Sequence, residues 1–342
     1  MSVRLLLALF CLAVVLFAAA FGYFGLALPA GVNGESFVQI PPGAGTRRIA
    51  AILADDGVIR SRYAFDLWQV LRGGTLKAGE YRFAGKARLP EVYERLRRGD
   101  VYLRAVVIPE GFNVFDVARA MESAQLSSKQ SFLAAARADA FLIADLDPGA
   151  RSLEGYLFPD TYRFERRETP DQILATMVKR FRSAAGSIGL HSDYRRTVTL
   201  ASLVERETPI AADRPQVASV FENRLAKGMP LMTDPTVIYA ALLENRFRGA
   251  IYRSDLERDS DYNTYVHAGL PPGPICNPGL ASLEAAMHPA KTTYLYFVAD
   301  PAANGHSSFS TTLEEHQRNV AAYRRGRRAA TSSAQTSPQP SR

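Results

Sequence analysis

The chain has 342 residues, of which 47% are hydrophobic and 22% are charged. This length and composition are typical of one large or two smaller globular domains and exclude a largely disordered chain. The formal net charge is +7, but the segment from Arg324 onward holds five arginines and no acid, so the rest carries only +2. A solvated basic end differs from a groove that follows phosphates, and nucleic-acid binding is not expected.

The first predicted element is an apolar run without any charge, residues 5–28. A helix rises about 1.5 Å per residue, so this run extends over about 36 Å, enough to cross the hydrocarbon of a bilayer. A cleaved signal peptide is the alternative, but its apolar core usually has only about 7–15 residues. Arg4 precedes the run and the next charge is Glu35. The positive-inside rule therefore predicts a cytoplasmic stub at 1–4, a single-pass anchor at 5–28 and an extracytoplasmic body.

A short internal repeat follows a Gly/Pro-rich segment, residues 29–36, that is expected to be a linker. VQIPPGAGTRRIAAIL, starting at Val38, and VVIPEGFNVFDVARAM, starting at Val106, share a short strand, a Pro-x-Gly turn and an amphipathic helix. Downstream, AGEYRF and FPDTYRF form a weaker second echo. The sequence predicts one strand–turn–helix–strand unit occurring twice, with extra helix in the second copy. The first copy, residues 37–104, is expected to be a separable α/β module.

The second half is predominantly helical in its pattern. Apolar residues recur at helical spacing and the segments begin with capping residues or proline. A Gly/Pro-rich loop at 263–279 interrupts them, and a strand-like segment at 294–299 precedes a final helix from Thr311. The sequence therefore predicts an α+β protein whose second domain, residues 105–323, is mostly helical with a small sheet. Residues 324–342 are expected to be a disordered basic tail. Helices are predicted at 169–185, 200–208, 213–228, 233–243 and 280–287.

Two glutamates close the apolar segment LASLVERETP, residues 200–209. At about 100° per residue from Leu200, Leu203 falls at about 300° and Val204 at about 40°. Glu207 falls at about 340°, inside this apolar stripe, whereas Glu205 falls at about 140°, on its flank. The wheel predicts that Glu207 faces the core side at the helix end, where a cleft can reach it, and that Glu205 has at most a supporting role.

A buried glutamate at such a helix end has two readings. It could simply cap the helix or pair with an arginine such as Arg214 or Arg224. Alternatively, burial raises its pKa and keeps it protonated, as a general acid acting on a glycosidic bond requires. Hydrolytic glycosidases usually add a second carboxylate, for which Asp234 is a candidate, although it also fits a helix cap. A reaction whose nucleophile is an internal sugar hydroxyl needs only one.

Other kinds of site find less support. The five histidines form no His-x-x-x-His pair and have no cysteine partner at zinc spacing, so no metal is expected. No phosphate-binding glycine loop is present, and no cofactor is expected. The amides, tyrosines and prolines of the 263–279 loop suit a sugar groove, or only a rigid connection.

Several blocks taken together resemble the endolytic murein transglycosylases of the MltG type, the YceG-like family. They occur in similar order and spacing from the anchor to about Tyr323. The blocks are LEGYLFPDTY, ASLVERET, ASVFENRL, GMPLMTDPTVIYA, YNTY, GLPPGPICNPG, YLYFVAD and GHSSFSTTLEEH.

The resemblance implies an inner-membrane enzyme with its body in the periplasm or outer wall space. It implies cleavage of nascent peptidoglycan between N-acetylmuramic acid and N-acetylglucosamine, without water, which leaves 1,6-anhydro ends and ends strand elongation. The first module then corresponds to a LysM-like peptidoglycan-binding module, and penicillin-binding-protein synthases are expected nearby. The family's catalytic glutamate, the one directly before threonine, maps onto Glu207.

The motif and the loop composition give the remaining site predictions. Support for the acid is expected from Glu205 and Thr208. A non-enzymatic, membrane-anchored peptidoglycan-binding scaffold is the competing interpretation, and a hydrolase using Asp234 is another. Substrate binding is predicted for Asn223, Thr233, Asp234, Asn263, Thr264 and Tyr265.

Overall fold

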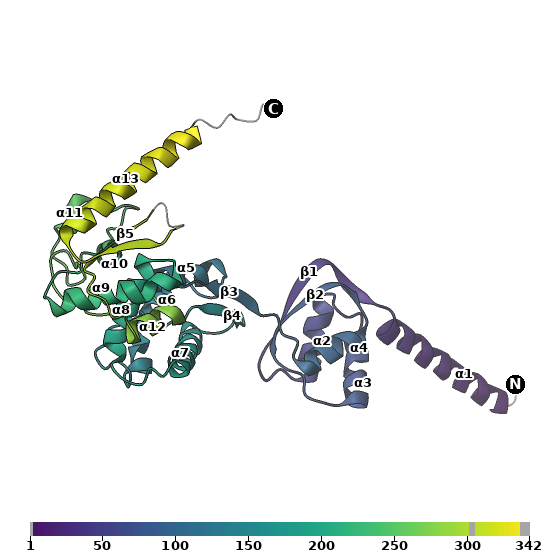
Figure 1. Ribbon diagram of the computed structural model, residues 1–342. Coiled ribbons are helices and arrows are strands. Elements are labelled where there is room, and N and C mark those ends of the chain that lie inside the picture. Colours follow the sequence, from purple (N-terminus) through teal and green to yellow (C-terminus); the bar gives the residue numbers. More distant parts are fainter. Residues whose placement is uncertain (1–2, 301–304, 336–342) are drawn as a thin grey trace. The chain divides into compact units, whose positions relative to one another are not determined.

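The computed structural model describes residues 3–300 and 305–335. It has a mixed α+β fold, with an apolar N-terminal helix and a mostly helical body that carries small two-stranded sheets (Figure 1). The chain forms two compact units. The N-terminal unit comprises the residues up to Arg104 together with Arg163–Arg167, and the C-terminal unit comprises Ala105–Tyr162 and the chain from Glu168 onward.

The apolar run forms helix α1, Val3–Gly22, which continues into the short π-helix η1, Tyr23–Ala27. Together they are a 25-residue helix, and its most apolar 18-residue window has a mean hydropathy of 2.8. Large apolar side chains remain exposed along α1, as they do on a helix that meets lipid rather than protein. By length and composition this helix can cross a membrane.

The prediction of a linker over residues 29–36 is wrong, because most of this segment belongs to strand β1, Ala30–Ile40. β1 pairs antiparallel with β2, Gly79–Ala87, and the register shifts between Gly31 and Glu35. A Cβ on Gly31 would lie 2.2 Å from the carbonyl oxygen of Gly85, so only glycine allows this close approach. The glycines that suggested a linker instead make an irregular strand possible.

Helices α2, Thr46–Asp55, and α3, Arg62–Arg72, connect β1 to β2, and α4, Leu89–Arg98, follows. Their apolar faces and the inward side chains of the two strands form one core. Its largest fully buried members include Tyr81, Tyr93 and Phe65.

The predicted repeat is present in the structure. In the second copy, strand β3, Arg104–Ile108, pairs with β4, Asp160–Phe164. Gly43 and Gly111 occupy equivalent places in the Pro-x-Gly turns and have φ angles of 72° and 78°, a region that favours glycine. Both copies hold two α-helices, so the extra helix of the second copy is only the 3-10 turn η2, Asp139–Ile143. The α-helices of the second copy are α5, Val114–Ser123, and α6, Lys129–Ala138.

Helix α8, Tyr194–Glu207, is the centre of the C-terminal unit. It contacts α9, Arg214–Ala226; α10, Asp234–Leu243; and α12, Leu280–Met287. An apolar core surrounds it, with Leu200, Leu203 and Val204 packed against Val217 and Phe221 of α9. The unit also contains α7, Pro170–Ser187; η3, Ala211–Asp213; and α11, Arg253–Leu256.

An antiparallel hairpin and a long helix complete the described chain. Strand β5, Tyr296–Ala299, pairs with β6, Ser307–Ser310, and α13, Leu313–Gln335, follows. The sequence analysis predicts disorder from residue 324, whereas in the structure α13 continues to Gln335. Arginine and alanine, which are frequent in this segment, are both good helix formers. Residues 336–342 of the predicted tail lie outside the described residues.

Candidate active site

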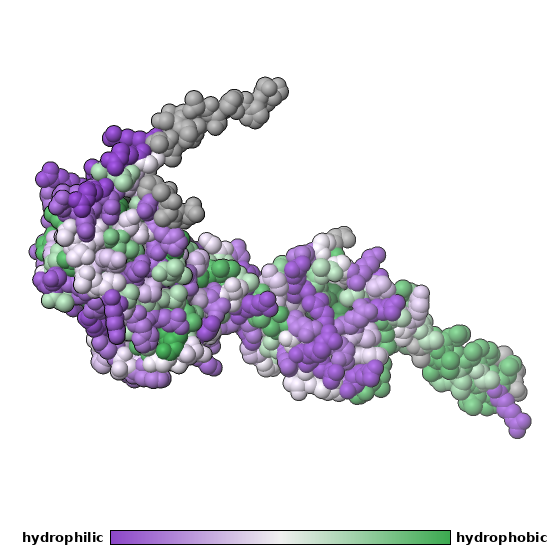
Figure 2. Space-filling view, in the orientation of Figure 1, coloured by the Kyte–Doolittle hydropathy of each residue, from purple (hydrophilic) through white to green (hydrophobic). Residues whose placement is uncertain are grey.

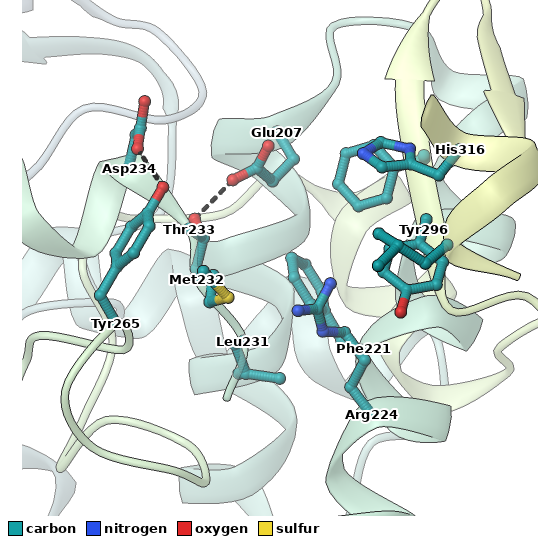
Figure 3. A pocket seen from close by; sticks show the side chains of 12 residues that line it. Glu207, Phe221, Arg224, Leu231, Met232, Thr233, Asp234, Tyr265, Tyr296 and His316 are labelled. Atoms are coloured by element: carbon teal, nitrogen blue, oxygen red, sulfur yellow. Dashed lines mark hydrogen bonds between the residues drawn. The ribbon is translucent and has the colours of Figure 1, made fainter. Parts of the chain in front are cut away.

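Glu207 is the last residue of α8, whose preceding residues from Val198 to Val204 are all buried. The helix ends there because Thr208 takes an extended conformation, with φ −139° and ψ 129°. The buried Thr208 side chain accepts a hydrogen bond from the Ile210 amide, at 3.1 Å, which fixes the turn. The side chain of Glu207 is thereby directed into a cavity beside the helix end (Figure 3).

The cavity has a volume of about 460 Å³ and lies within the C-terminal unit. One side is formed by the end of α8 and the start of α10, and the other by α9, β5 and α13. Apolar and polar side chains share its walls, as expected for a site that binds sugars through ring faces and hydroxyls. Its lining residues are Glu207, Phe221, Arg224, Leu231, Met232, Thr233, Asp234, Tyr265, Tyr296, Phe297, Leu313 and His316.

Glu207 is held by a hydroxyl and not by a cation. Thr233 Oγ1 donates a hydrogen bond to Glu207 Oε1 at 2.5 Å (Figure 3). Burial raises the pKa of Glu207 above its ordinary value, and the hydrogen bond from Thr233 only partly opposes this. The nearby Asp234 carboxylate adds to the rise in pKa. Among the described residues no ion pair to Glu207 lies within 4.0 Å, so pairing with Arg214 or Arg224 is not its role.

Asp234 has a partner of its own in the cavity. The Tyr265 hydroxyl donates to Asp234 Oδ1 at 2.6 Å (Figure 3). Burial, and then this carboxylate, raise the pKa of Tyr265, so the phenol stays protonated at neutral pH. Asp234 also begins α10, where the helix dipole favours a negative charge. Asp234, predicted as the cap of this helix, is therefore its first helical residue, and Thr233 occupies the N-cap position.

Sequence reasoning assigned none of the residues of the opposite wall to the site, and three of them carry polar groups: Arg224, Tyr296 and His316. Arg224 donates to the carbonyls of Pro230 and Leu295 at 3.0 and 3.2 Å, and its guanidinium lies 5.6 Å from the centre of the Tyr296 ring. His316 stacks on the same ring, 5.1 Å away. Burial, and then Arg224, lower the pKa of His316, so its imidazole is neutral at neutral pH.

Three of the six residues predicted to bind substrate line the cavity: Thr233, Asp234 and Tyr265. The other three lie outside its lining, because their polar groups satisfy buried backbone. Asn223 donates to the carbonyls of Thr292 and Tyr294. Asn263 donates to two carbonyls at the end of α11 and to one in the loop after it. Thr264 Oγ1 accepts from the Thr233 amide at 3.1 Å and so positions Thr233.

The supporting residues predicted beside Glu207 also lie outside the cavity lining. Glu205 forms an ion pair with Arg214 at 2.9 Å, and it accepts a hydrogen bond from the Gly279 amide at 2.9 Å. Both side chains of the pair are more than nine-tenths buried. Glu205 therefore connects α8 to the starts of α9 and α12. Among the described residues no group of three or more His, Cys, Asp or Glu side chains is placed to hold a metal ion.

Comparison with known proteins places this site in a family. The YceG-like family matches residues 38–322. An endolytic murein transglycosylase of Bacillus subtilis is 36% identical over 306 residues, which cover 82% of each chain. A protein of the same name from Streptococcus pneumoniae D39 is 32% identical, over 89% of this chain and 62% of its own length.

A solved structure agrees with these relatives. The crystal structure of a yceG-like protein from Listeria monocytogenes is similar with a TM-score of 0.54 and 33% identity. The match covers 83% of this chain and 98% of the Listeria chain. Because the family match extends over most of the chain and includes the whole cavity, this protein belongs to the YceG-like family.

Proposed function

We propose that this chain is an endolytic murein transglycosylase that cleaves peptidoglycan glycan strands. The observation that carries the proposal is a half-buried glutamate with a raised pKa, lining a cavity that mixes apolar rings with hydrogen-bonding groups. Relatives that bear this name are more than 30% identical over most of the chain. A single protonatable carboxyl without a cation beside it is what acid catalysis at a glycosidic oxygen requires.

Glu207 acts as the general acid. It donates its proton to the oxygen that links C1 of N-acetylmuramic acid to C4 of N-acetylglucosamine, and the C1–O bond breaks. The C6 hydroxyl of the same muramic acid attacks C1, and its proton passes to the Glu207 carboxylate, which restores the acid. The products are a 1,6-anhydro end and a free C4 hydroxyl, and no water is consumed. Such cuts in nascent strands would end their elongation.

The neighbours of Glu207 prepare it for this role. Because Thr233 occupies Oε1, Oε2 is the oxygen that can carry the proton toward the sugar. Asp234 is hydrogen-bonded to Tyr265, and its charge favours the protonated form of Glu207. Across the cavity, Arg224 can bind polar groups of the glycan and the Tyr296 ring can pack on a sugar face.

The rest of the chain would bring this site to its substrate. The N-terminal apolar helix serves as a single-span anchor, with the body on the outer side of the cytoplasmic membrane. The β1–α2–α3–β2 arrangement supports a LysM-like role, in which this module holds peptidoglycan. Cutting nascent strands would require penicillin-binding-protein synthases close by.

The test is digestion of purified glycan strands by the full chain in detergent, with the product masses read by mass spectrometry. The wild-type chain is expected to give 1,6-anhydro products, and Glu207→Gln is expected to lose activity by at least about a hundredfold. Glu257→Gln, on an exposed carboxylate of an i,i+4 pair, is the matched control and should keep full activity.

Other outcomes would contradict the proposal. Reducing ends, heavier than anhydro ends by one water, would indicate a hydrolase that uses Asp234 as its second carboxylate. If wild type and Glu207→Gln bind glycan equally and neither cuts it, the chain is a binding scaffold. A melting temperature of Glu207→Gln equal to that of wild type shows that the substitution leaves the fold intact.

A further inference from the structure

Helix α3 of the N-terminal unit exposes an apolar face. Tyr63, Leu67, Val70 and Leu71 are 63%, 45%, 81% and 67% exposed. Their spacing of four, seven and eight residues brings them to one side of the helix. The opposite side of α3 is buried in the core of the module and includes Phe65. Soluble helices rarely expose a continuous apolar stripe, so this face is expected to have a partner.

The end of the apolar N-terminal helix packs directly against α3. η1 contacts both α3 and α4, and Phe21 and Leu26 pack against the core of the module. Gly25 is buried at this contact, and a Cβ there would lie only 2.7 Å from the Cβ of Ala64 on α3. The guanidinium of Arg60, just before α3, donates to the carbonyl of Pro29 at 3.2 and 3.3 Å. The end of the membrane helix is therefore in direct contact with α3, although β1 and α2 lie between them in the sequence.

Basic residues lie at both ends of the apolar face. Arg62 begins α3 and Arg72 ends it, and both are exposed. The only acid on α3 is Asp66, which is half-buried. Arginines at the ends of an apolar helix face can reach lipid phosphates while the apolar side chains contact the acyl region. Figure 2 shows hydrophobic residues at the lower edge of the N-terminal unit, over α3, in addition to those of the membrane helix.

We propose that α3 lies on the surface of the same bilayer that the N-terminal helix crosses, with Tyr63, Leu67, Val70 and Leu71 toward the acyl chains. Continuity carries this assignment: the face begins beside the point where the membrane helix ends, and the two are joined by close packing. The bilayer would then hold the module against its outer surface and fix its orientation. The proposal depends on residues 3–27 spanning the membrane, and it is independent of catalysis by Glu207.

Trp68 offers a direct test because it is the only tryptophan in the chain and lies on α3. The full chain is reconstituted into vesicles of phosphatidylcholine and phosphatidylglycerol whose acyl chains are brominated, and Trp68 fluorescence is compared with that in unbrominated vesicles. Bromine quenches only at short range, and Trp68 is half-buried beside Leu67 of the apolar face, so clear quenching is expected. In a Val70→Asp/Leu71→Asp chain the quenching should be at least about twofold weaker, because charged side chains leave the acyl region. Phe141→Asp, at a side chain 67% exposed in the C-terminal unit, is the matched control and should quench like wild type.

Four results would contradict the docking of α3 on the bilayer. If the chain resists extraction at alkaline pH but Trp68 is not quenched, the anchor stands and the docking of α3 is wrong. Equal quenching of wild type and the double aspartate variant also overturns the assignment of this face. If alkaline extraction releases the chain, both the anchor and the docking fail. Trp68 fluorescence that depends on protein concentration and not on bromine would show that a second copy covers this face.

Discussion

Two carboxylates at the end of α8 stand two residues apart and meet different surroundings. Glu205 pairs with the guanidinium of Arg214 and accepts from a backbone amide, whereas within the described chain the hydroxyl of Thr233 is the hydrogen-bond partner of Glu207. A cation would favour ionisation, but a hydroxyl in a buried place leaves desolvation as the main influence. The raised pKa of Glu207 follows from this difference. The environment, and not the residue type, suits one of them to donate a proton.

The raised pKa of Glu207 predicts how activity depends on pH. A general acid works in its protonated form, so the contribution of Glu207 is present below its folded-state pKa and is lost as the pH rises through it. The hydrogen bond from Thr233 lowers this pKa, so Thr233→Val should raise it further. The alkaline limb of kcat/KM against pH is expected to move to higher pH. A Thr233→Val profile that is lowered uniformly, without a shift, would contradict this role; Thr176→Val on α7 is the control.

The residues of the site differ in how far sequence could reveal them. The wheel predicts that Glu207 lies on the apolar side of its helix, where a cleft can reach it, and in the structure Glu207 does line the cavity. The stripe itself is not one-sided, because every residue of α8 from Val198 to Val204 is buried. The wheel placed Glu205 on the flank but could not show that Arg214 of another helix buries it. Tyr296 and His316 come from β5 and α13, so only the tertiary fold brings them opposite Glu207. Their only signal in the sequence was their presence in the blocks that resemble the family.

At the scale of elements, the Glu205–Arg214 pair joins three helices. Glu205 is on α8, Arg214 begins α9, and the Gly279 amide precedes α12. Glu205→Ala leaves a buried guanidinium without its main partner and should lower the free energy of unfolding by about 3–5 kcal/mol. Urea unfolding of the full chain in detergent measures this.

A control and a conservative change make the result specific. Glu257→Ala removes one member of an exposed i,i+4 pair and should change the free energy of unfolding by less than about 0.5 kcal/mol. Glu205→Gln keeps an acceptor for the Gly279 amide and should cost less than Glu205→Ala. If Glu205→Ala and Glu257→Ala have equal effects, the buried pair does not hold these helices together.

The elements also show where sequence patterns are ambiguous. The two Pro-x-Gly turns were recognisable because a glycine with positive φ is needed at the same place in both copies. The prediction of a linker over residues 29–36 was wrong because glycine occurs both in flexible linkers and in strands with an irregular register. Asn223 and Asn263 are of a residue type that is common in sugar sites, yet their amides donate to backbone carbonyls. Which carbonyls need such a donor depends on the backbone groups that the fold leaves unpaired, and the sequence does not reveal these.

At the scale of the whole molecule, the function depends on whether the N-terminal helix is retained. A span of 25 residues with its end packed into the module favours retention over cleavage. The intact mass of the chain isolated from membranes is expected to include residues 3–27. Cys11 gives a second readout, because it lies within this helix and should be alkylated only after detergent is added. A mass that lacks the apolar helix would show that it acts as a cleaved signal peptide.

In the proposed reaction, the position of Glu207 as the last residue of α8 would affect the second half as well as the first. The final carbonyls of a helix have no partner within the helix and carry a partial negative charge. In the proposed reaction Glu207 would give up its proton at this helix end, where burial and the Asp234 carboxylate already favour its protonated form. Burial, the Asp234 charge and the helix end would together make the conjugate base a stronger base than a glutamate in solvent. The same helix end that favours the stored proton also drives Glu207 to recover one from the attacking sugar hydroxyl, so each cut would leave the enzyme ready for the next.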